Sequence, residues 1–123
     1  RTGNDLTIVS WSRQALIAEE AAATLAAEGI QAEVIDLRTL WPWDRETVLH
    51  SAARTGHVLV THEAIQVAGF GAEIAATVAE HTGARVKRLG APRIPVGYAP
   101  VLESESRIGA AKVVAAAHEL LKR

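Results

Sequence analysis

Residues 57–81 read HVLVTHEAIQVAGFGAEIAATVAEH and contain the unit from which the rest of the chain is built. His57–Thr61 is a short apolar run typical of a buried strand, 62–69 is a loop, and Phe70–His81 carries apolar residues at helical spacing. Gly83 follows where that helix should end. A strand followed by a helix predicts one half of a crossover between parallel strands.

Similar units lie on both sides of this stretch. The other predicted strands are Asp5–Trp11, Ala32–Leu37 and Arg85–Leu89. The other predicted helices run from Ser12, as N-cap, to Gly29; from Arg45 to Arg54, between the N-cap Asp44 and Gly56; and from Ser106 to Lys122. The two connecting segments are a turn at Thr39–Trp43 and an irregular stretch at Ala91–Leu102, both of which contain proline.

This alternation predicts a three-layer α/β domain in which helices flank a mostly parallel sheet. The length of 123 residues suits one domain, and 49% apolar with 22% charged residues suits a folded one. The chain begins with Arg1 and contains no Met, so we expect residues 1–123 to be a domain from a longer protein.

Composition also excludes several classes of partner. The net charge of −1 offers no general attraction to nucleic acid, and no apolar run reaches the ~20 residues that would cross a membrane. The absence of Cys removes disulfides and thiolate metal sites. We therefore expect a soluble, cytoplasmic protein that binds neither nucleic acid nor membrane.

The candidate chemical motifs are weak. Gly69-Phe70-Gly71 lacks the third glycine of a dinucleotide site and the Lys of a P-loop, so close helix packing explains its small residues better. The histidines have no metal-ligand spacing, and three of them are expected on solvated helix surfaces: His50, His81 and His118. The sequence predicts no catalytic, cofactor-binding or metal-binding residue in this chain.

Two pairs leave alternatives open. His62 and Glu63 follow the third strand, at the sheet end where α/β proteins place functional loops, so His62 either contacts a partner or anion or bonds to a neighbouring loop. Ser12 and Arg13 begin the first helix and are a possible anion site, although capping alone also explains Ser12.

Aromatic residues are few, and most are tryptophan. Trp41 and Trp43 flank Pro42 in a turn, and two indoles so placed do not both bury easily in a small core. Tryptophan is enriched at protein interfaces, which favours a domain that docks against something. The alternative for Trp41 is that it folds back over the rim of its own domain.

Several stretches, taken in order, resemble the C-terminal domain of transketolase-like enzymes, and more narrowly the β subunit of the E1 component of 2-oxo acid dehydrogenases. They are Asp5-Leu-Thr-Ile-Val9, Asp36-Leu-Arg-Thr-Leu-Trp-Pro-Trp-Asp44, Val58-Leu-Val-Thr-His-Glu-Ala64, Gly69-Phe-Gly-Ala-Glu-Ile-Ala-Ala76, Pro95-Val-Gly-Tyr-Ala-Pro100 and Leu102-Glu103. Thr61–Ala64 and Gly69-Phe70 look closer to the branched-chain than to the pyruvate members. Departures are Ala68, where a Gly is usual, and Arg93 and Gly97, where Asp and Pro are common.

The resemblance implies a parent enzyme that decarboxylates a 2-oxo acid on thiamine diphosphate with Mg²⁺, both held outside this domain, and passes the acyl group to a lipoyl-bearing E2 acyltransferase. The implied partners are the E1 α subunit and a second β subunit in an α₂β₂ tetramer, and the subunit-binding domain of E2. The isolated fragment is then expected to be inactive. The residues predicted to make interdomain or intersubunit contacts are Trp41, Trp43, His62, Glu63, Phe70 and Tyr98.

Two other functions remain open from the sequence. One is the same domain in a transketolase or a deoxyxylulose-phosphate synthase. The other is a free-standing module that binds an anion or small ligand near Ser12, Arg13 and His62.

Overall fold

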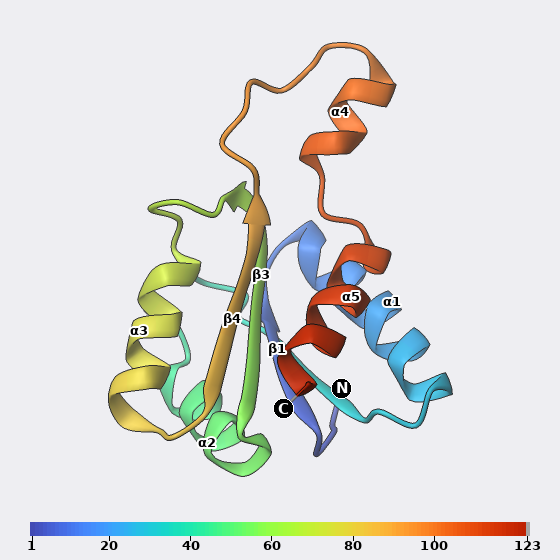
Figure 1. Cartoon of the computed structure of the whole chain (residues 1–123). Coiled ribbons are helices and arrows are strands. Elements are labelled where there is room, and N and C mark those ends of the chain that lie inside the picture. The colour runs from blue at the N-terminus through green and yellow to red at the C-terminus, as the bar shows by residue number, and fades with distance from the viewer. Residues whose placement is uncertain (123) are drawn as a thin grey trace.

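The computed structural model describes residues 1–122 and has four strands that alternate with helices (Figure 1). The strands are β1 (Leu6–Ser10), β2 (Ala32–Asp36), β3 (His57–Ile65) and β4 (Arg85–Ala91). The helices are α1 (Arg13–Ala27), α2 (Arg45–Thr55), α3 (Gly71–His81), α4 (Pro100–Ser106) and α5 (Ala110–Leu121). None of the helices in this described part is long and apolar enough to span a bilayer.

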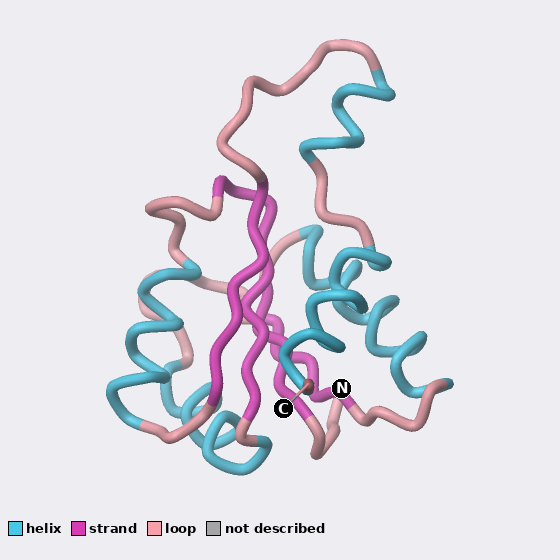
Figure 2. Tube along the Cα trace, viewed as in Figure 1, coloured by secondary structure: helices cyan, strands magenta, loops and turns pink. Residues whose placement is uncertain are grey.

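The strands form one parallel sheet in the order β2-β1-β3-β4. Helices α1 and α5 cover one face of the sheet, and α2 and α3 cover the other (Figures 1 and 2). This is the three-layer α/β architecture that the alternation of strands and helices predicts. All four strands point the same way, so the loops after their carboxyl ends gather at one end of the sheet.

Each face of the sheet has its own apolar core. Leu6, Ile8 and Leu59 pack with the buried faces of α1 and α5, and Val9, Val58 and Val60 pack with α2 and α3. The two central strands, β1 and β3, are buried on both faces, which requires the mainly apolar composition that they have. Many of the helix residues in contact with the sheet are alanines, which let the helices approach closely.

The helix caps agree only in part with the sequence. Asp44 caps α2 as predicted, because its carboxylate accepts from the backbone N–H of Thr47 at 3.1 Å, and Gly56 ends the helix with the expected positive φ of 69°. Ser12 does occupy the N-cap position of α1, but its φ is 56° and its side chain makes no capping hydrogen bond. The prediction of a Ser12 side-chain cap was wrong.

Three predicted boundaries also differ. The third strand continues to Ile65, so His62 and Glu63 lie in β3 and not in a loop, with an irregular register between Thr61 and Ile65. The segment after β4 contains a short helix, α4, that begins at Pro100. The last helix begins at Ala110, not at Ser106, because residues 107–109 are non-helical and separate α4 from α5.

Candidate subunit-contact surface

An aromatic cluster lies where β1 and β3 end. The Trp11 indole stacks on the His62 imidazole, with ring centroids 5.1 Å apart and 19° between the planes. Phe70 meets Trp11 edge-on at 5.9 Å and Trp43 edge-on at 6.3 Å. The loop after β1, the turn before α2 and the start of α3 are therefore joined by side chains that the sequence presents as separate.

His62 is the buried member of this cluster, with no exposed surface. Its Nδ1 lies 3.0 Å from the Ala64 carbonyl oxygen, and its Nε2 is buried with no hydrogen-bond partner among residues 1–122. Burial lowers the pKa of His62 below its usual value, and the Arg88 charge lowers it further, although the Ala64 carbonyl opposes them. The imidazole is thus neutral at pH 7, with Nδ1–H as the donor to Ala64.

Glycines provide the space for this imidazole. A Cβ at Gly71 would lie 2.6 Å from His62 Nε2, and one at Gly69 or Gly90 would lie 2.8 Å from His62 Cε1. These distances are well below normal contact. The small residues of the Gly69-Phe70-Gly71 motif therefore allow α3 and β4 to close over His62, which agrees with the packing interpretation of that motif.

The predicted anion site at Ser12 and Arg13 is arranged differently from the expectation. Arg13 Nη1 donates to Glu63 Oε1 at 3.2 Å, so the guanidinium and the carboxylate form an exposed ion pair across the ends of β1 and β3. Beneath it, Gln14 Nε2 donates to Thr61 Oγ1 at 3.2 Å. This pairing neutralises the charge that an anion would use.

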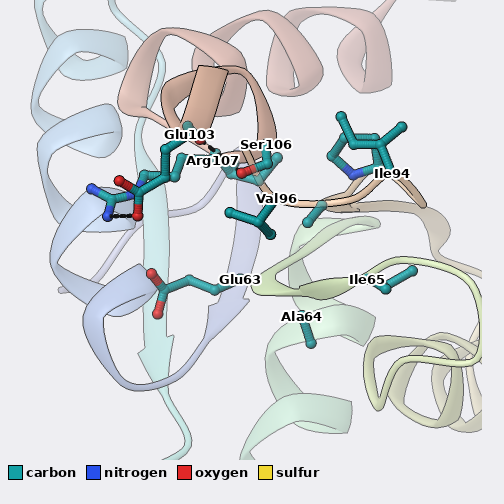
Figure 3. A pocket seen from close by; sticks show the side chains of 11 residues that line it. Glu63, Ala64, Ile65, Ile94, Val96, Glu103, Ser106 and Arg107 are labelled. Atoms are coloured by element: carbon teal, nitrogen blue, oxygen red, sulfur yellow. Dashed lines mark hydrogen bonds and ion pairs between the residues drawn. The ribbon is translucent and has the colours of Figure 1, made fainter. Parts of the chain in front are cut away.

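A cavity of about 380 Å³ opens beside Glu63 (Figure 3). It lies between the end of β3 and the long connection from β4 to α5. Its apolar lining includes Ile65, Ile94 and Val96, and its rim carries the ion pair between Arg107 and Glu103. In Figure 1 this connection rises above the end of the sheet.

That connection exposes an unusual amount of apolar surface. We name as the contact surface the exposed apolar side chains between β4 and α5, which are Ile94, Val96, Tyr98, Val101 and Leu102. Tyr98 is fully exposed in the chain. Trp41, in the loop after the carboxyl end of β2, is 87% exposed. Contiguous apolar exposure of this kind typically marks a protein-contact site.

The six residues predicted to make contacts fall into two groups. Trp41 and Tyr98 are exposed, and Glu63 is half-exposed in its ion pair; their contact role stays a prediction. Trp43 and Phe70 are partly buried against each other, and His62 is fully buried in this chain; the contact role of these three also stays a prediction. Sequence reasoning missed Ile94, Val96 and Val101, whose signal was an apolar, proline-containing stretch without strand or helix periodicity.

Of the remaining histidines, His57 begins β3 and the other three lie on helices. His50 is exposed, His81 bonds to Arg45, and His118 Nε2 lies 2.8 Å from a Glu28 carboxylate oxygen. Across residues 1–122, no group of three or more His, Asp or Glu side chains is placed to hold a metal ion.

Comparison with known proteins places this arrangement in a family. A family model described as transketolase, C-terminal domain, matches residues 1–113. The chain is 48% identical over 87 residues to the mitochondrial 2-oxoisovalerate dehydrogenase subunit beta 2 of Arabidopsis thaliana, which covers 71% of this chain and 24% of that protein. It is 40% identical over 123 residues to 1-deoxy-D-xylulose-5-phosphate synthase 1 of Geobacter sulfurreducens, which covers 97% of this chain and 19% of that protein.

Among solved structures, the chain matches a split gene transketolase described as an inactive tetramer of four beta subunits. The TM-score is 0.90 and the identity 34%, over 98% of this chain and 40% of that one. The chain thus spans less than half the length of each of these proteins. Sequence and fold agree, and the chain belongs to the transketolase C-terminal domain family.

Proposed function

We propose that this chain is the C-terminal domain of the β subunit of a thiamine-diphosphate-dependent 2-oxo acid dehydrogenase E1, and that it serves the enzyme by docking to other subunits. The observation that carries the proposal is the contact surface, in which apolar side chains and the fully exposed Tyr98 gather on one connection. A monomer gains nothing from leaving such side chains in water, whereas an interface buries them at about 25 cal/mol per Å².

The chemistry of the parent enzyme lies outside this domain in our proposal. Thiamine diphosphate and Mg²⁺ would support decarboxylation of a 2-oxo acid elsewhere in the parent protein. The residues of this chain would hold the assembly together, and the isolated chain would not turn over substrate. The proposed partners are the E1 α subunit and a second β subunit in an α₂β₂ tetramer, and the subunit-binding domain of E2.

The experiment that tests docking uses the full parent β subunit purified with its α subunit. The double substitution Tyr98→Asp and Val101→Asp places charge on the contact surface and is expected to reduce the mass of the complex, measured by light scattering after size exclusion. Leu16→Asp is the matched control, because Leu16 is 72% exposed on α1 and is not part of the contact surface. An unchanged mass in the double variant, or an equal loss in the control, would contradict the proposal.

The proposed substrate is a branched-chain 2-oxo acid. The similarity to a 2-oxoisovalerate dehydrogenase subunit supports this choice. The assembled parent enzyme should then decarboxylate 2-oxoisovalerate faster than pyruvate at equal concentration. Faster turnover of pyruvate would refute the branched-chain assignment and leave the docking role intact.

The second candidate is the same domain in a deoxyxylulose-phosphate synthase or a transketolase, which the similarity to the Geobacter protein and to the split gene transketolase supports. The same assay separates the two candidates. A parent protein that joins pyruvate to glyceraldehyde 3-phosphate, or transfers a two-carbon unit between sugar phosphates, would favour the second.

A further inference from the structure

The outer edge of β4 is open. β4 is the last strand in the sheet order, and within residues 1–122 no strand lies beyond it. In Figure 1, β4 stands in front of β3, and α3 and α5 lie to its two sides. The helices therefore cover the faces of the sheet at this position, whereas the edge itself faces outward.

Backbone geometry shows which groups this edge presents. The backbone N–H of Arg85 donates to Gly56 O at 2.9 Å, and Ala91 O accepts from the backbone N–H of Gln66 at 3.0 Å. Alternate residues of a parallel strand bond to opposite sides, so the backbone groups of Val86 and Arg88 face away from β3. The next outward N–H, that of Gly90, already donates to Gln66 Oε1 at 3.1 Å, so the open stretch of the edge is at Val86 and Arg88. Unpaired N–H and C=O groups of this kind are a template for another strand.

The same edge is strongly basic. Residues 85–93 read RVKRLGAPR, with four basic and no acidic residues, although the whole chain has a net charge of −1. Among residues 1–122, Lys87 Nζ lies 2.7 Å from a Glu119 carboxylate oxygen, and no carboxylate pairs with Arg88 or Arg93. Arg88 Nη1 donates to the backbone carbonyl oxygen of Gln66 at 3.2 Å. A hollow of about 380 Å³ beside the edge is lined by the basic Lys87, Arg88 and Lys112 and by one carboxylate, that of Glu119.

The unpaired backbone groups and the basic side chains together indicate which kind of molecule binds this edge. A second copy of this chain could pair with the edge through its own β4, but the like charges of the two strands would repel each other. Nucleic acid would use the positive charge and leave the unpaired backbone groups unused. An extended acidic segment satisfies both, because its backbone pairs with the strand and its carboxylates neutralise the basic side chains.

We propose that the outer edge of β4 binds an extended acidic peptide segment of another protein by strand addition, with Arg88 and Arg93 as the main charged contacts. The segment lies along Val86 and Arg88 as a fifth strand, and its carboxylates lie in the hollow lined by Lys87 and Lys112. This role does not depend on which reaction the parent enzyme performs.

The test measures fluorescence anisotropy of a labelled synthetic peptide in which Glu and Val alternate, titrated with the purified chain. We expect saturable binding that weakens as NaCl is raised from low to high concentration. The same peptide with N-methyl groups on alternate residues keeps its charge but cannot donate those backbone hydrogen bonds, and should bind about tenfold more weakly or worse.

Charge-reversal variants locate the site. Arg88→Glu and Arg93→Glu, alone and combined, should each weaken binding, and the pair should weaken it by about tenfold or more. Arg93 is exposed in the connection after β4, so its variant remains informative if Arg88→Glu impairs folding. Arg38→Glu makes the same change of charge after β2, at the other edge of the sheet, and should leave binding unchanged.

Several results would overturn the proposal. They are no saturable binding of the peptide, equal binding of the N-methylated peptide, and an equal loss of binding in Arg38→Glu. Equal binding of a single-stranded oligonucleotide, with the same loss in the Arg88 and Arg93 variants, would identify a general polyanion site in place of strand addition.

Discussion

His62 shows how strongly one buried side chain depends on its surroundings. Its imidazole is stacked on Trp11, enclosed by three glycines and neutral, with a lowered pKa caused mainly by burial. Protonation would place a charge in that site, and the adjacent Arg88 adds repulsion. The unfolded chain, by contrast, releases this proton near pH 6.5.

We therefore predict that His62 makes the domain less stable in mild acid. Because the folded pKa lies below the unfolded value, the unfolded state binds more protons as the pH falls, and the free energy of unfolding decreases below about pH 6.5. Urea unfolding at pH 7.5 and 5.5 measures this decrease. His62→Gln should reduce the pH dependence, while the exposed His50→Gln should retain it; the same dependence in both variants would contradict the assignment.

The glycines around this imidazole give a second prediction. Gly71→Ala places a methyl group 2.6 Å from His62 Nε2 and 3.2 Å from Val60 Cγ1, so it should lower the free energy of unfolding by about 1–3 kcal/mol. Gly83→Ala is the control, since a Cβ there meets nothing within 4 Å. Chemical denaturation of both variants is the measurement. Equal stabilities would show that the packing around His62 is looser than the structure indicates.

At the scale of elements, the beginnings of α1 and α2 differ in a way that can be measured. Asp44 accepts hydrogen bonds from the backbone N–H and the hydroxyl of Thr47, and these bonds lower the pKa of its carboxyl group. Ser12 occupies the equivalent place before α1 without such a bond. The two residues look alike in sequence and act differently in the fold.

Asp44→Ala should therefore lower the free energy of unfolding by about 1 kcal/mol, whereas Ser12→Ala should change it much less. Thermal unfolding of the two variants followed by circular dichroism compares them directly. A loss for Ser12→Ala as large as that for Asp44→Ala would mean that Ser12 caps α1 in solution.

At the scale of the whole molecule, apolar side chains serve two purposes. Val113 and Leu120 of α5 are buried against the sheet, and truncating Leu120 to Ala should destabilise the domain by about 2–5 kcal/mol. Val96 and Val101 of the contact surface are exposed. Their replacement by Ser should leave the free energy of unfolding nearly unchanged, because no burial is lost in the isolated domain.

Solubility and urea unfolding of the Val96→Ser and Val101→Ser variants test this distinction. We expect higher solubility without loss of stability. A loss comparable to that of Leu120→Ala would show that the connection between β4 and α5 packs onto the domain, which would remove the main support for a docking surface.

The family, the order of strands and helices and the parallel sheet could all be predicted from the sequence, because apolar periodicity and turn residues such as Gly56 and Gly83 are local signals. The separate helix α4 was harder to predict, since its few residues carry no periodicity. Its apolar residues Val101 and Leu102 are exposed, and the local sequence does not distinguish them from buried apolar residues.

The site depended on contacts between distant parts of the chain. Arg13 and Glu63 are 50 positions apart, and the sequence shows each only as a charged residue near the end of a strand. His62 looked like a loop residue, yet Trp11, Gly71 and Gly90 converge on it to bury it. Local sequence thus determined which elements form, whereas burial and partners were decided by tertiary packing, since they depend on which residues the folded sheet brings together.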